Sequence, residues 1–375
     1  MNSVQYFFEK SALLERDFVL GNRETITFLD LYTQSSRLAS YLSETAGSKK
    51  NIILVSNNNN FFLVCYFGIM MSGNVCVPLD PTIEQKNFEY ILKECEADAV
   101  FTESRLLSKL TADSVKIITE KKYLNLIENQ PNFKIPDFFD SELPAQIIFT
   151  SGSTGVPKGV VLSHKNIIAN TNSIIEYLNL TKNDIIEVVL PFYYCYGLSL
   201  LHTHLRVGGS IVLNNNFIFI SSVFNDINKY KCTGFAGVPS HFQILLRKSN
   251  GFKNTKFPTL RYVTQAGGKL HTSFIEEFTI AFPDIDFYVM YGQTEATARL
   301  SYLEPDMLKT KLGSIGKGIP NVHLMVVNEK GDQVKPGETG EIIAKGENIM
   351  LGYYKDTETT NNTIKNGWLY TGDMG

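Results

Sequence analysis

The sequence lacks the features by which membrane-spanning, nucleic-acid-binding and cysteine-ligated metal proteins are usually recognised. Its most apolar run, residues 61–71, is shorter than the ~20 residues that a spanning helix needs. The formal net charge of -3 provides no positive field that would hold nucleic acid. The five cysteines are scattered, with neither CxxC nor Cys/His ligand spacing. We therefore expect a cytoplasmic protein with reduced thiols, without a membrane span and without a nucleic-acid partner.

What the sequence does have is a long alternation of strand-like and helix-like segments. Expected strands cover 51–56, 75–79, 98–102, 115–119 and 145–150, and expected helices cover 60–71 and 84–95, with a further helix after 98–102. Unbroken apolar strands separated by helices indicate a parallel sheet that is covered on both faces, because a strand buried on both sides does not need alternating polarity. This part of the chain is predicted to be doubly wound.

A second series of strands and helices begins near Asp184, with expected helices at 239–249 and 271–281. After about Ala298, short strands separated by glycine-rich turns predict a small β-barrel. The predicted fold class is therefore α/β, with two packed doubly wound αβ sheets plus a small β-barrel. The predicted subdomains cover approximately 48–180, 1–47 together with 181–297, and 298–375.

A loop with the composition of a phosphate-binding site follows the strand expected at 145–150. It contains Thr150, Ser151, Gly152, Ser153, Thr154, Gly155 and Lys158. Glycines let backbone N–H groups approach an anion closely, hydroxyls donate further hydrogen bonds, and the lysine adds a positive charge. The loop is not a Walker A motif, because Lys158 follows a proline and does not open a helix. A flexible Ser/Gly linker is the alternative, but it would not favour a lone lysine between buried strands.

The segment TSGSTGVPKG (150–159) resembles the signature loop of the adenylate-forming superfamily of acyl-CoA synthetases, carrier-protein adenylation domains and beetle luciferases. YGQTE (291–295) is similar to the second motif of that superfamily, and YTGD (370–373) is similar to the third. The stretch at 337–354 resembles the one that precedes the third motif, and the order and distances agree. The resemblance covers nearly the whole chain and implies that residues 1–375 form the large N-terminal domain of such an enzyme.

The resemblance also implies a role for each matched residue. ATP or AMP would be bound by the loop residues named above together with Gly267, Gly268, Tyr291, Gly292, Gln293, Thr294 and Asp373. The Tyr291 ring can stack on adenine, Asp373 can accept the ribose hydroxyls, and Glu295 is a hard oxygen ligand for Mg²⁺. Catalysis is assigned to Thr154, Lys158, Thr294 and Glu295. Taken singly, Tyr291 would be explained as core packing and Asp373 as an Asx-turn.

The acid-binding side departs from the family pattern. Tyr194 stands where the resemblance leads one to expect a histidine that gates the acyl pocket. No acidic residue lies between Leu190 and Leu201, so a partner for an ammonium group is missing there and an α-amino acid is disfavoured. Tyr194, Val238 and Pro239 are the predicted acyl pocket, which would accept an apolar or aryl group, although ordinary core packing would explain them as well.

The implied reaction activates a carboxylic acid with ATP, giving acyl-adenylate and pyrophosphate, and then forms a thioester with CoA or with a phosphopantetheine carrier protein. A carrier-loading enzyme and a non-catalytic nucleotide-binding half remain alternatives. Relatives have a C-terminal domain beyond the third motif that supplies a lysine; we expect it to be absent here and this chain alone to have low activity. The histidines at 202, 204, 241, 271 and 323 lack metal-ligand spacing and are predicted to be structural.

Overall fold

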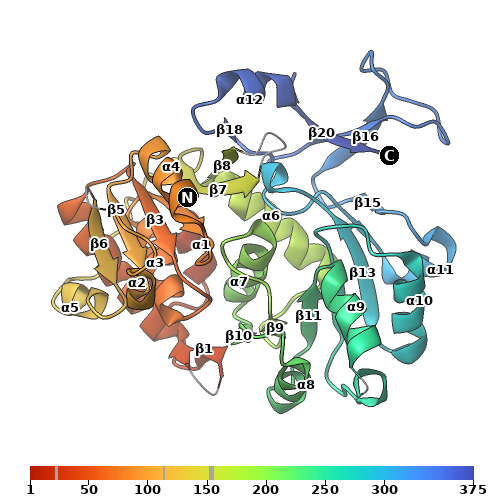
Figure 1. Cartoon of the computed structure of the whole chain (residues 1–375), viewed down its shortest axis with the longest axis horizontal. Coiled ribbons are helices and arrows are strands. Elements are labelled where there is room, and N and C mark those ends of the chain that lie inside the picture. The colour runs from red at the N-terminus through yellow and green to blue at the C-terminus, as the bar shows by residue number, and fades with distance from the viewer. Residues whose placement is uncertain (22–23, 113–114, 152–155, 250) are drawn as a thin grey trace.

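Three β-sheets and the helices that cover them make up the described part of the chain (Figure 1). The computed structural model describes residues 1–21, 24–112, 115–151, 156–249 and 251–375. Two sheets are large and lie beside each other, whereas the third is small and lies at the top of the view in Figure 1, where it includes the C-terminus.

The first large sheet has the strand order β18-β8-β7-β4-β3-β5-β6. Its strands are β3 (Asn51–Val55), β4 (Val75–Leu79), β5 (Ala99–Thr102), β6 (Lys116–Thr119), β7 (Pro144–Ser151), β8 (Pro157–Ser163) and β18 (Gly352–Tyr353). The strands from β7 to β6 are parallel, whereas β7 and β8 form an antiparallel hairpin to which β18 adds antiparallel.

Both faces of this sheet are covered by helices. Ile52 and Leu54 share a core with α2 (Phe28–Thr45) and α3 (Asn60–Met71). Ile53 and Val55 pack on the opposite face with α4 (Gln85–Glu94). Successive residues of a strand point to opposite faces, so a strand between two helical layers is apolar at every position. This explains the unbroken apolar run that predicted a parallel sheet.

The second large sheet has the order β15-β14-β13-β12-β11-β9-β10-β1-β2. Its strands are β1 (Asp17–Leu20), β2 (Ile26–Thr27), β9 (Ile185–Val188), β10 (Ser210–Leu213), β11 (Gly234–Gly237), β12 (Tyr262–Gln265), β13 (Asp286–Tyr291), β14 (Ser301–Leu303) and β15 (Lys317–Gly318). The strands from β1 to β13 are parallel. One face packs against α8 (Ile220–Lys229), α9 (Pro239–Lys248) and α10 (Thr272–Ala281), and the other against α6 (His164–Leu178) and α7 (Cys195–Val207).

Helices from both halves of the chain form one core between the two large sheets. Tyr66 of α3 lies 2.8 Å from His202 of α7, hydroxyl to Nε2, and the Phe7 ring of α1 (Ser3–Phe8) stacks on His202 at 4.7 Å between centroids. Apolar residues of both sheets belong to this cluster. The predicted pair of packed αβ sheets is confirmed, and the shared core holds the carboxyl ends of their strands in a fixed relation.

The third sheet is small and antiparallel, in the order β16-β17-β20-β19, and it stands where a small β-barrel was predicted. It contains β16 (His323–Val327), β17 (Glu341–Lys345), β19 (Ile364–Lys365) and β20 (Trp368–Met374), with α12 (Thr357–Thr363) before β19. Meanwhile β14 and β15 extend the second sheet beyond residue 297, and β18 joins the first. Strands from the predicted third subdomain therefore also belong to the two large sheets, and the subdomain boundaries stay a prediction.

One predicted helix is wrong. Between β5 and β6 the described residues form only a 3₁₀ turn, η1 (Ser104–Leu106), because the Glu120 carboxylate accepts hydrogen bonds from the Ser104 backbone N–H (2.6 Å) and hydroxyl (2.5 Å) and ties the segment to the end of β6. The other short helices in the described residues are α5 (Tyr123–Ile127), α11 (Leu308–Lys311) and the 3₁₀ turns η2 (Phe252–Asn254) and η4 (Pro305–Met307). The apolar run at 61–71 is buried in α3, and none of the helices in the described ranges is long and apolar enough to cross a bilayer.

Candidate active site

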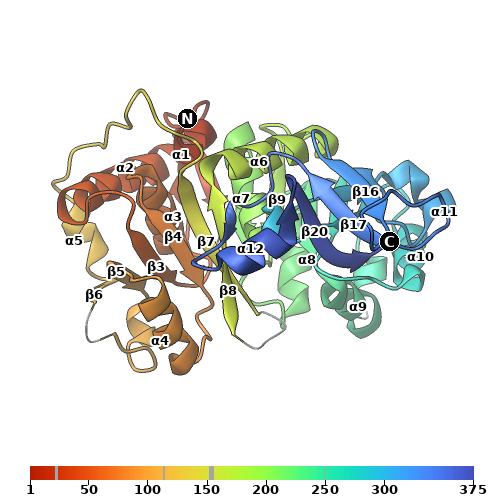
Figure 2. The same cartoon turned by 90° about the horizontal axis from the view of Figure 1, so that it is seen from above.

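Lys158 and Asp373 lie on β8 and β20, whereas most of the other predicted site residues lie at or after the carboxyl ends of β7, β11, β12 and β13. In parallel α/β sheets these ends are the usual place for a ligand, because the loops that leave them converge on one edge. Figure 2 shows the β7–β8 hairpin in the middle of the molecule, between the helices of the first sheet and the strands of the small sheet. The site is therefore built where the three sheets meet.

The β7–β8 hairpin carries the predicted phosphate loop. Thr150 and Lys158 are opposite each other in the ladder, and the Thr150 hydroxyl donates to the Lys158 carbonyl at 3.5 Å. The Lys158 ammonium lies 5.6 Å from the centre of the Tyr353 ring. The predicted ligands Gly152, Ser153, Thr154 and Gly155 lie outside the described residues, and Ser151 is described only as the last residue of β7. The last described pair of the hairpin ladder is that of Ser151 with Pro157.

The second motif begins where β13 ends, at Tyr291. The chain then turns so tightly that a Cβ at Gly292 would lie 2.2 Å from the Ala298 carbonyl oxygen, so only glycine fits. Gln293 precedes the 3₁₀ turn η3 (Thr294–Ala296), which holds Thr294 and Glu295. The strand and the tight turn therefore bring a ring, a hydroxyl and a carboxylate to the same sheet edge.

Tyr291 and Asp373 meet although they are far apart in the sequence. The Tyr291 hydroxyl donates to Asp373 Oδ2 at 2.7 Å. Burial raises the pKa of Tyr291 above its usual value, and the Asp373 carboxylate adds to the rise, so the phenol stays a donor at neutral pH. Because adenine is bonded directly to ribose, a ring that stacks on the base and a carboxylate that accepts the ribose hydroxyls must be neighbours. The predicted pair meets this condition, and Asp373 Oδ1 is not used by the bond to Tyr291.

Glu295 is held by the segment that precedes the third motif. The Tyr353 hydroxyl donates to Glu295 Oε1 at 2.8 Å, and the Met350 N–H donates to the Glu295 carbonyl at 2.9 Å. Glu295, Tyr353 and Gln293 line a cavity of about 270 Å³ together with Thr371 and Gly372.

This arrangement fits a magnesium ion that is bound mainly through a nucleotide. Within the described ranges there is no group of three or more His, Cys, Asp or Glu side chains that could hold a metal by itself. Mg²⁺ is usually bound by one or two carboxylates, phosphate oxygens and water rather than by an all-protein cage. A single oriented carboxylate at the wall of a cavity, such as that of Glu295, suits this mode of binding.

The glycine pair and the predicted acyl pocket are in contact. Gly267 and Gly268 have φ angles of +80° and +157°, which L side chains rarely adopt. A Cβ on Gly267 would lie 3.1 Å from Val238, and one on Gly268 would lie 3.3 Å from Pro239. The exposed Gly267–Gly268 backbone therefore runs directly beside Val238 and Pro239.

Tyr194 lies in the loop that leads from β9 to α7. Its side chain is about 50% exposed, and its ring packs against that of Tyr193, 4.7 Å between centroids. The next residue, Cys195, has its Sγ 3.5 Å from Thr294 Oγ1. The loop with the predicted gate residue thus contacts Thr294 of the second motif.

A carboxylate that the sequence analysis did not consider lies near this loop. Burial raises the pKa of Tyr193 and of Tyr194, and the Asp80 carboxylate raises both further. Asp80 follows β4 and accepts hydrogen bonds from the Thr82 N–H and hydroxyl, both at 2.7 Å. The absence of acidic residues between 190 and 201 therefore does not make the whole neighbourhood of the pocket free of negative charge.

Most of the histidines that were predicted to be structural lie in the core or cap a helix. Burial lowers the pKa of His202 to about 3 and that of His204 to about 4, so both are neutral inside the core. His271 caps α10 by accepting from the Ser273 N–H. His241 is closer to the site than expected, since its Nδ1 accepts from the Val238 N–H at 3.4 Å.

Comparisons with known proteins show which family the chain resembles. The family described as "AMP-binding enzyme" matches residues 4–354. A long-chain-fatty-acid–CoA ligase of Escherichia coli O6:H1 is 27% identical over 400 residues, which covers 94% of this chain and 70% of the relative. The indoleacetate–CoA ligase of Aromatoleum aromaticum is 26% identical over 365 residues, which covers 93% of this chain and 71% of the relative.

Solved structures show the same architecture. The o-succinylbenzoate CoA synthetase of Bacillus subtilis, in complex with the acyl-adenylate intermediate OSB-AMP, superposes with a TM-score of 0.87 at 25% sequence identity. The superposition covers 100% of this chain and 75% of that one. The part of the synthetase that matches therefore includes every sheet described above.

Proposed function

Since the chain belongs to the AMP-binding enzyme family, we propose that it activates a carboxylic acid with ATP to an acyl-adenylate and pyrophosphate, and that the acyl group then passes to CoA. The observation that carries the proposal is the contact between Tyr291 and Asp373 beside Thr294 and Glu295. This contact unites the second and third motifs into one surface that suits a base, a ribose and a phosphate.

In the first step, a carboxylate oxygen of the acid attacks the α-phosphorus of ATP. The bond between the α-phosphorus and the oxygen that bridges to the β-phosphate breaks, and pyrophosphate leaves with the electron pair. No general base is needed, because a carboxylate is already ionised at neutral pH. In the second step, the thiol sulfur of CoA attacks the acyl carbonyl, AMP leaves, and the thiol proton is released.

The residues of this chain would act mainly by alignment and charge neutralisation, as is general for phosphorus chemistry. Lys158 would neutralise phosphate charge, and the Thr294 hydroxyl would donate to the α-phosphate. Thr154 is proposed to act in the same way. Mg²⁺ held by Glu295 would supply further neutralisation of the phosphate oxygens. Tyr291 would stack on adenine beside the Gly267–Gly268 backbone, and Asp373 would accept from the ribose.

We propose fatty or aryl acids as the substrate class. Tyr194, Val238 and Pro239 offer apolar and aromatic surface, and Val238 and Pro239 adjoin the glycine pair assigned to adenine. Two relatives are named for a long-chain fatty acid and for indoleacetate, which supports this class. A phosphopantetheine carrier protein is the alternative acceptor, since its arm carries the same thiol. Slow turnover by the 375 residues tested alone also remains a prediction.

Nucleotide binding is tested by thermal unfolding of the 375-residue chain. AMP, and ATP with Mg²⁺, should raise the melting temperature, because a ligand that binds only the folded form stabilises it. GTP should do much less. A folded chain whose melting temperature does not change at millimolar ATP with Mg²⁺ would contradict the site.

Adenylation is tested by exchange of labelled pyrophosphate into ATP, screened across fatty, aryl and amino acids. Exchange that depends on a fatty or aryl acid supports the proposal. A clear preference for a free amino acid would overturn the substrate class while leaving the reaction type intact, and the rate measures how active the 375 residues are alone.

A further inference from the structure

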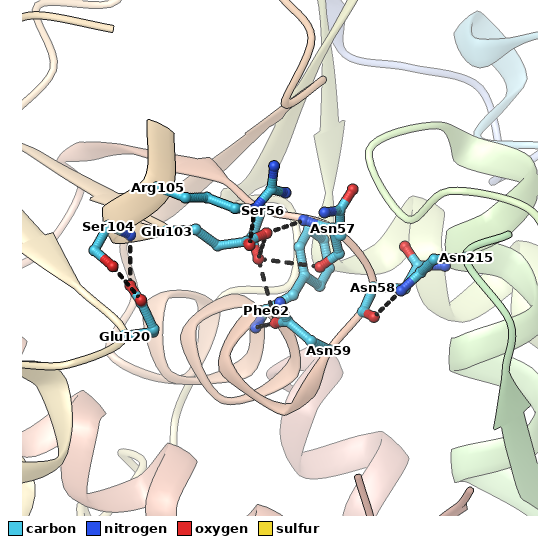
Figure 3. Close-up of polar contacts among 10 residues, drawn as sticks. All are labelled: Ser56, Asn57, Asn58, Asn59, Phe62, Glu103, Ser104, Arg105, Glu120 and Asn215. Atoms are coloured by element: carbon cyan, nitrogen blue, oxygen red, sulfur yellow. Dashed lines mark hydrogen bonds and ion pairs between the residues drawn. The ribbon is translucent and has the colours of Figure 1, made fainter. Parts of the chain in front are cut away.

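The turn between β3 and α3, residues 56–59, is firmly attached to the first sheet (Figure 3). The Glu103 Oε1 atom accepts from the Ser56 hydroxyl at 3.1 Å and from the Asn57 N–H at 2.7 Å. The Asn59 side chain caps α3 by accepting from the Phe62 N–H at 2.8 Å. The turn therefore has a fixed position at the carboxyl end of β3, which makes it a rigid base for anything it holds.

Asn58 of this turn reaches toward the second sheet. Its Nδ2 donates to the Leu190 carbonyl at 2.8 Å, and its Oδ1 accepts from the Phe192 N–H at 2.8 Å. The residue is only 4% exposed. In addition, Asn215, which follows β10, donates through its side chain to the Asn58 carbonyl at 2.7 Å, as Figure 3 shows. One carboxamide thus uses its donor and its acceptor on the backbone of a single loop.

The loop that Asn58 holds is the one that leads to Tyr193, Tyr194 and Cys195. Its other side is fixed as well, since a Cβ on Gly197 would lie 2.1 Å from the Pro191 carbonyl oxygen, so the first turn of α7 packs directly against the loop. At the end of the loop, Cys195 contacts Thr294. A shift of the backbone at 190–192 would therefore move both the predicted gate and its contact with the α-phosphate motif.

We propose that Asn58 is a positioning residue for the acid-binding loop 190–195: the hydrogen bonds of this side chain set where the loop stands against the nucleotide. The proposal deepens the proposed function and rests on it. Removing the side chain leaves a buried N–H and a buried carbonyl without their partners, and a loop in that state moves to regain hydrogen bonds. The nucleotide contacts at Tyr291 and Asp373 do not involve Asn58.

The positioning itself is tested without any assumption about function. Hydrogen exchange of the segment 190–195 is measured in the 375-residue chain and in Asn58→Ala, Asn215→Ala and Asn57→Ala. The Phe192 amide should lose protection in Asn58→Ala, by about tenfold or more if the bond costs ~1.4 kcal/mol to open. Asn215→Ala, at an exposed position, should show the same change to a smaller extent and should fold even where Asn58→Ala does not.

Asn57→Ala is the matched control, because within the described residues the Asn57 side chain makes no hydrogen bond to this loop, and the backbone N–H that donates to Glu103 is kept. It should leave the exchange of 190–195 unchanged. Unaltered protection of Phe192 in a folded Asn58→Ala would overturn the proposal.

The link to the acid is tested with two probes, AMP and non-hydrolysable acyl-sulfamoyladenosines that carry a decanoyl or a benzoyl group. The acyl increment is the ratio of their affinities. In Asn58→Ala the increment should fall by about tenfold, or ~1.4 kcal/mol, while AMP binding changes by less than about twofold. Equal weakening of AMP and of the acyl probes would show a general structural role and overturn the proposal.

Failure of the proposed function has a different signature. In that case the unmodified chain would gain no affinity from either acyl group, whatever happens at the Phe192 amide. A wild-type increment that persists unchanged in Asn58→Ala would instead overturn the positioning role alone.

Discussion

The nucleotide side and the acid side of the candidate site are built in different ways. On the nucleotide side, Tyr291, Thr294 and Glu295 come from one contiguous segment at the end of β13, and Asp373 joins them from β20. On the acid side, Tyr194 stands on a loop whose backbone is held by Asn58, 132 positions earlier in the chain. Contiguous motifs therefore identify the nucleotide side in the sequence, whereas the acid-side loop depends on a contact with a segment that no motif marks. Substitutions on the two sides should separate nucleotide binding from acid binding.

The largest expected effect is that of Glu295→Gln on the nucleotide side. The substitution keeps an acceptor for the Tyr353 hydroxyl but removes the charge that holds a hard divalent cation. Mg²⁺-ATP binding should weaken and acid-dependent pyrophosphate exchange should fall by on the order of 100-fold or more, while AMP binding survives. Calorimetry with AMP and with Mg²⁺-ATP measures the contrast.

Tyr353→Phe is the control for that experiment, because it frees the carboxylate without removing its charge. It should lower exchange by only about threefold. Equal weakening of AMP and Mg²⁺-ATP in Glu295→Gln would assign Glu295 to the structure of the turn, and unchanged exchange would refute the metal assignment.

The second effect in size concerns ribose and adenine. Asp373→Ala should weaken AMP by about tenfold or more, because hydrogen bonds to a charged acceptor are lost. Tyr291→Ala should weaken it similarly through lost stacking, whereas Tyr291→Phe keeps the ring and should cost less than about threefold. The affinity of each variant for AMP, measured by calorimetry, checks these expectations. If Tyr291→Phe is as damaging as Tyr291→Ala, the hydroxyl bond to Asp373 matters more than the ring.

The third effect should be confined to the acid side. Tyr194→Ala should change the KM for the preferred acid by about fivefold and leave AMP affinity within about twofold, since the side chain lies outside the nucleotide motifs. Steady-state exchange at varied acid and at varied ATP separates the two constants. If the KM for the acid and the KM for ATP change by the same factor, Tyr194 does not act on the acid side alone.

The smallest expected effect concerns the core that both sides share. Burial lowers the pKa of His202 to about 3 from a usual 6.5, so the folded chain keeps it neutral while the unfolded chain takes up a proton below about pH 6.5. Stability is therefore lost as pH falls from 6.5 toward 3, by about 1 kcal/mol for this histidine between about pH 6.5 and 5.5.

Urea unfolding at the two pH values measures this loss, and His202→Gln should flatten it by the same amount. Buried Glu187 has the opposite slope, because burial raises its pKa, and its contribution is common to both proteins. An unchanged pH dependence in His202→Gln would show that His202 is not the group that titrates.

The sequence predicted the fold class and the identity of the motif segments because both depend on local pattern. Strands such as β3 are apolar at every position, and YGQTE is contiguous. The sequence did not reveal Tyr353, Asp80 or Asn58 as neighbours of the site. Each of them comes from a segment outside the three motifs and approaches the site only through the tertiary fold. Asn58 also stands in a run of asparagines, and nothing local distinguishes it from an ordinary turn residue. The wrong helix after β5 has the same cause, since Glu120 reaches back to Ser104.

The two-residue strand β18 also covers a sheet edge that could otherwise pair with another copy of the chain. It pairs antiparallel with Val160 and Val161 of β8, which would otherwise be the outermost strand of the first sheet. An apolar strand with an open backbone edge is a template for pairing with other chains. A chain shortened before Gly352 should therefore self-associate, and light scattering at rising concentration would reveal it. The segment that contains Tyr353 thus both orients Glu295 and covers the exposed backbone edge of β8.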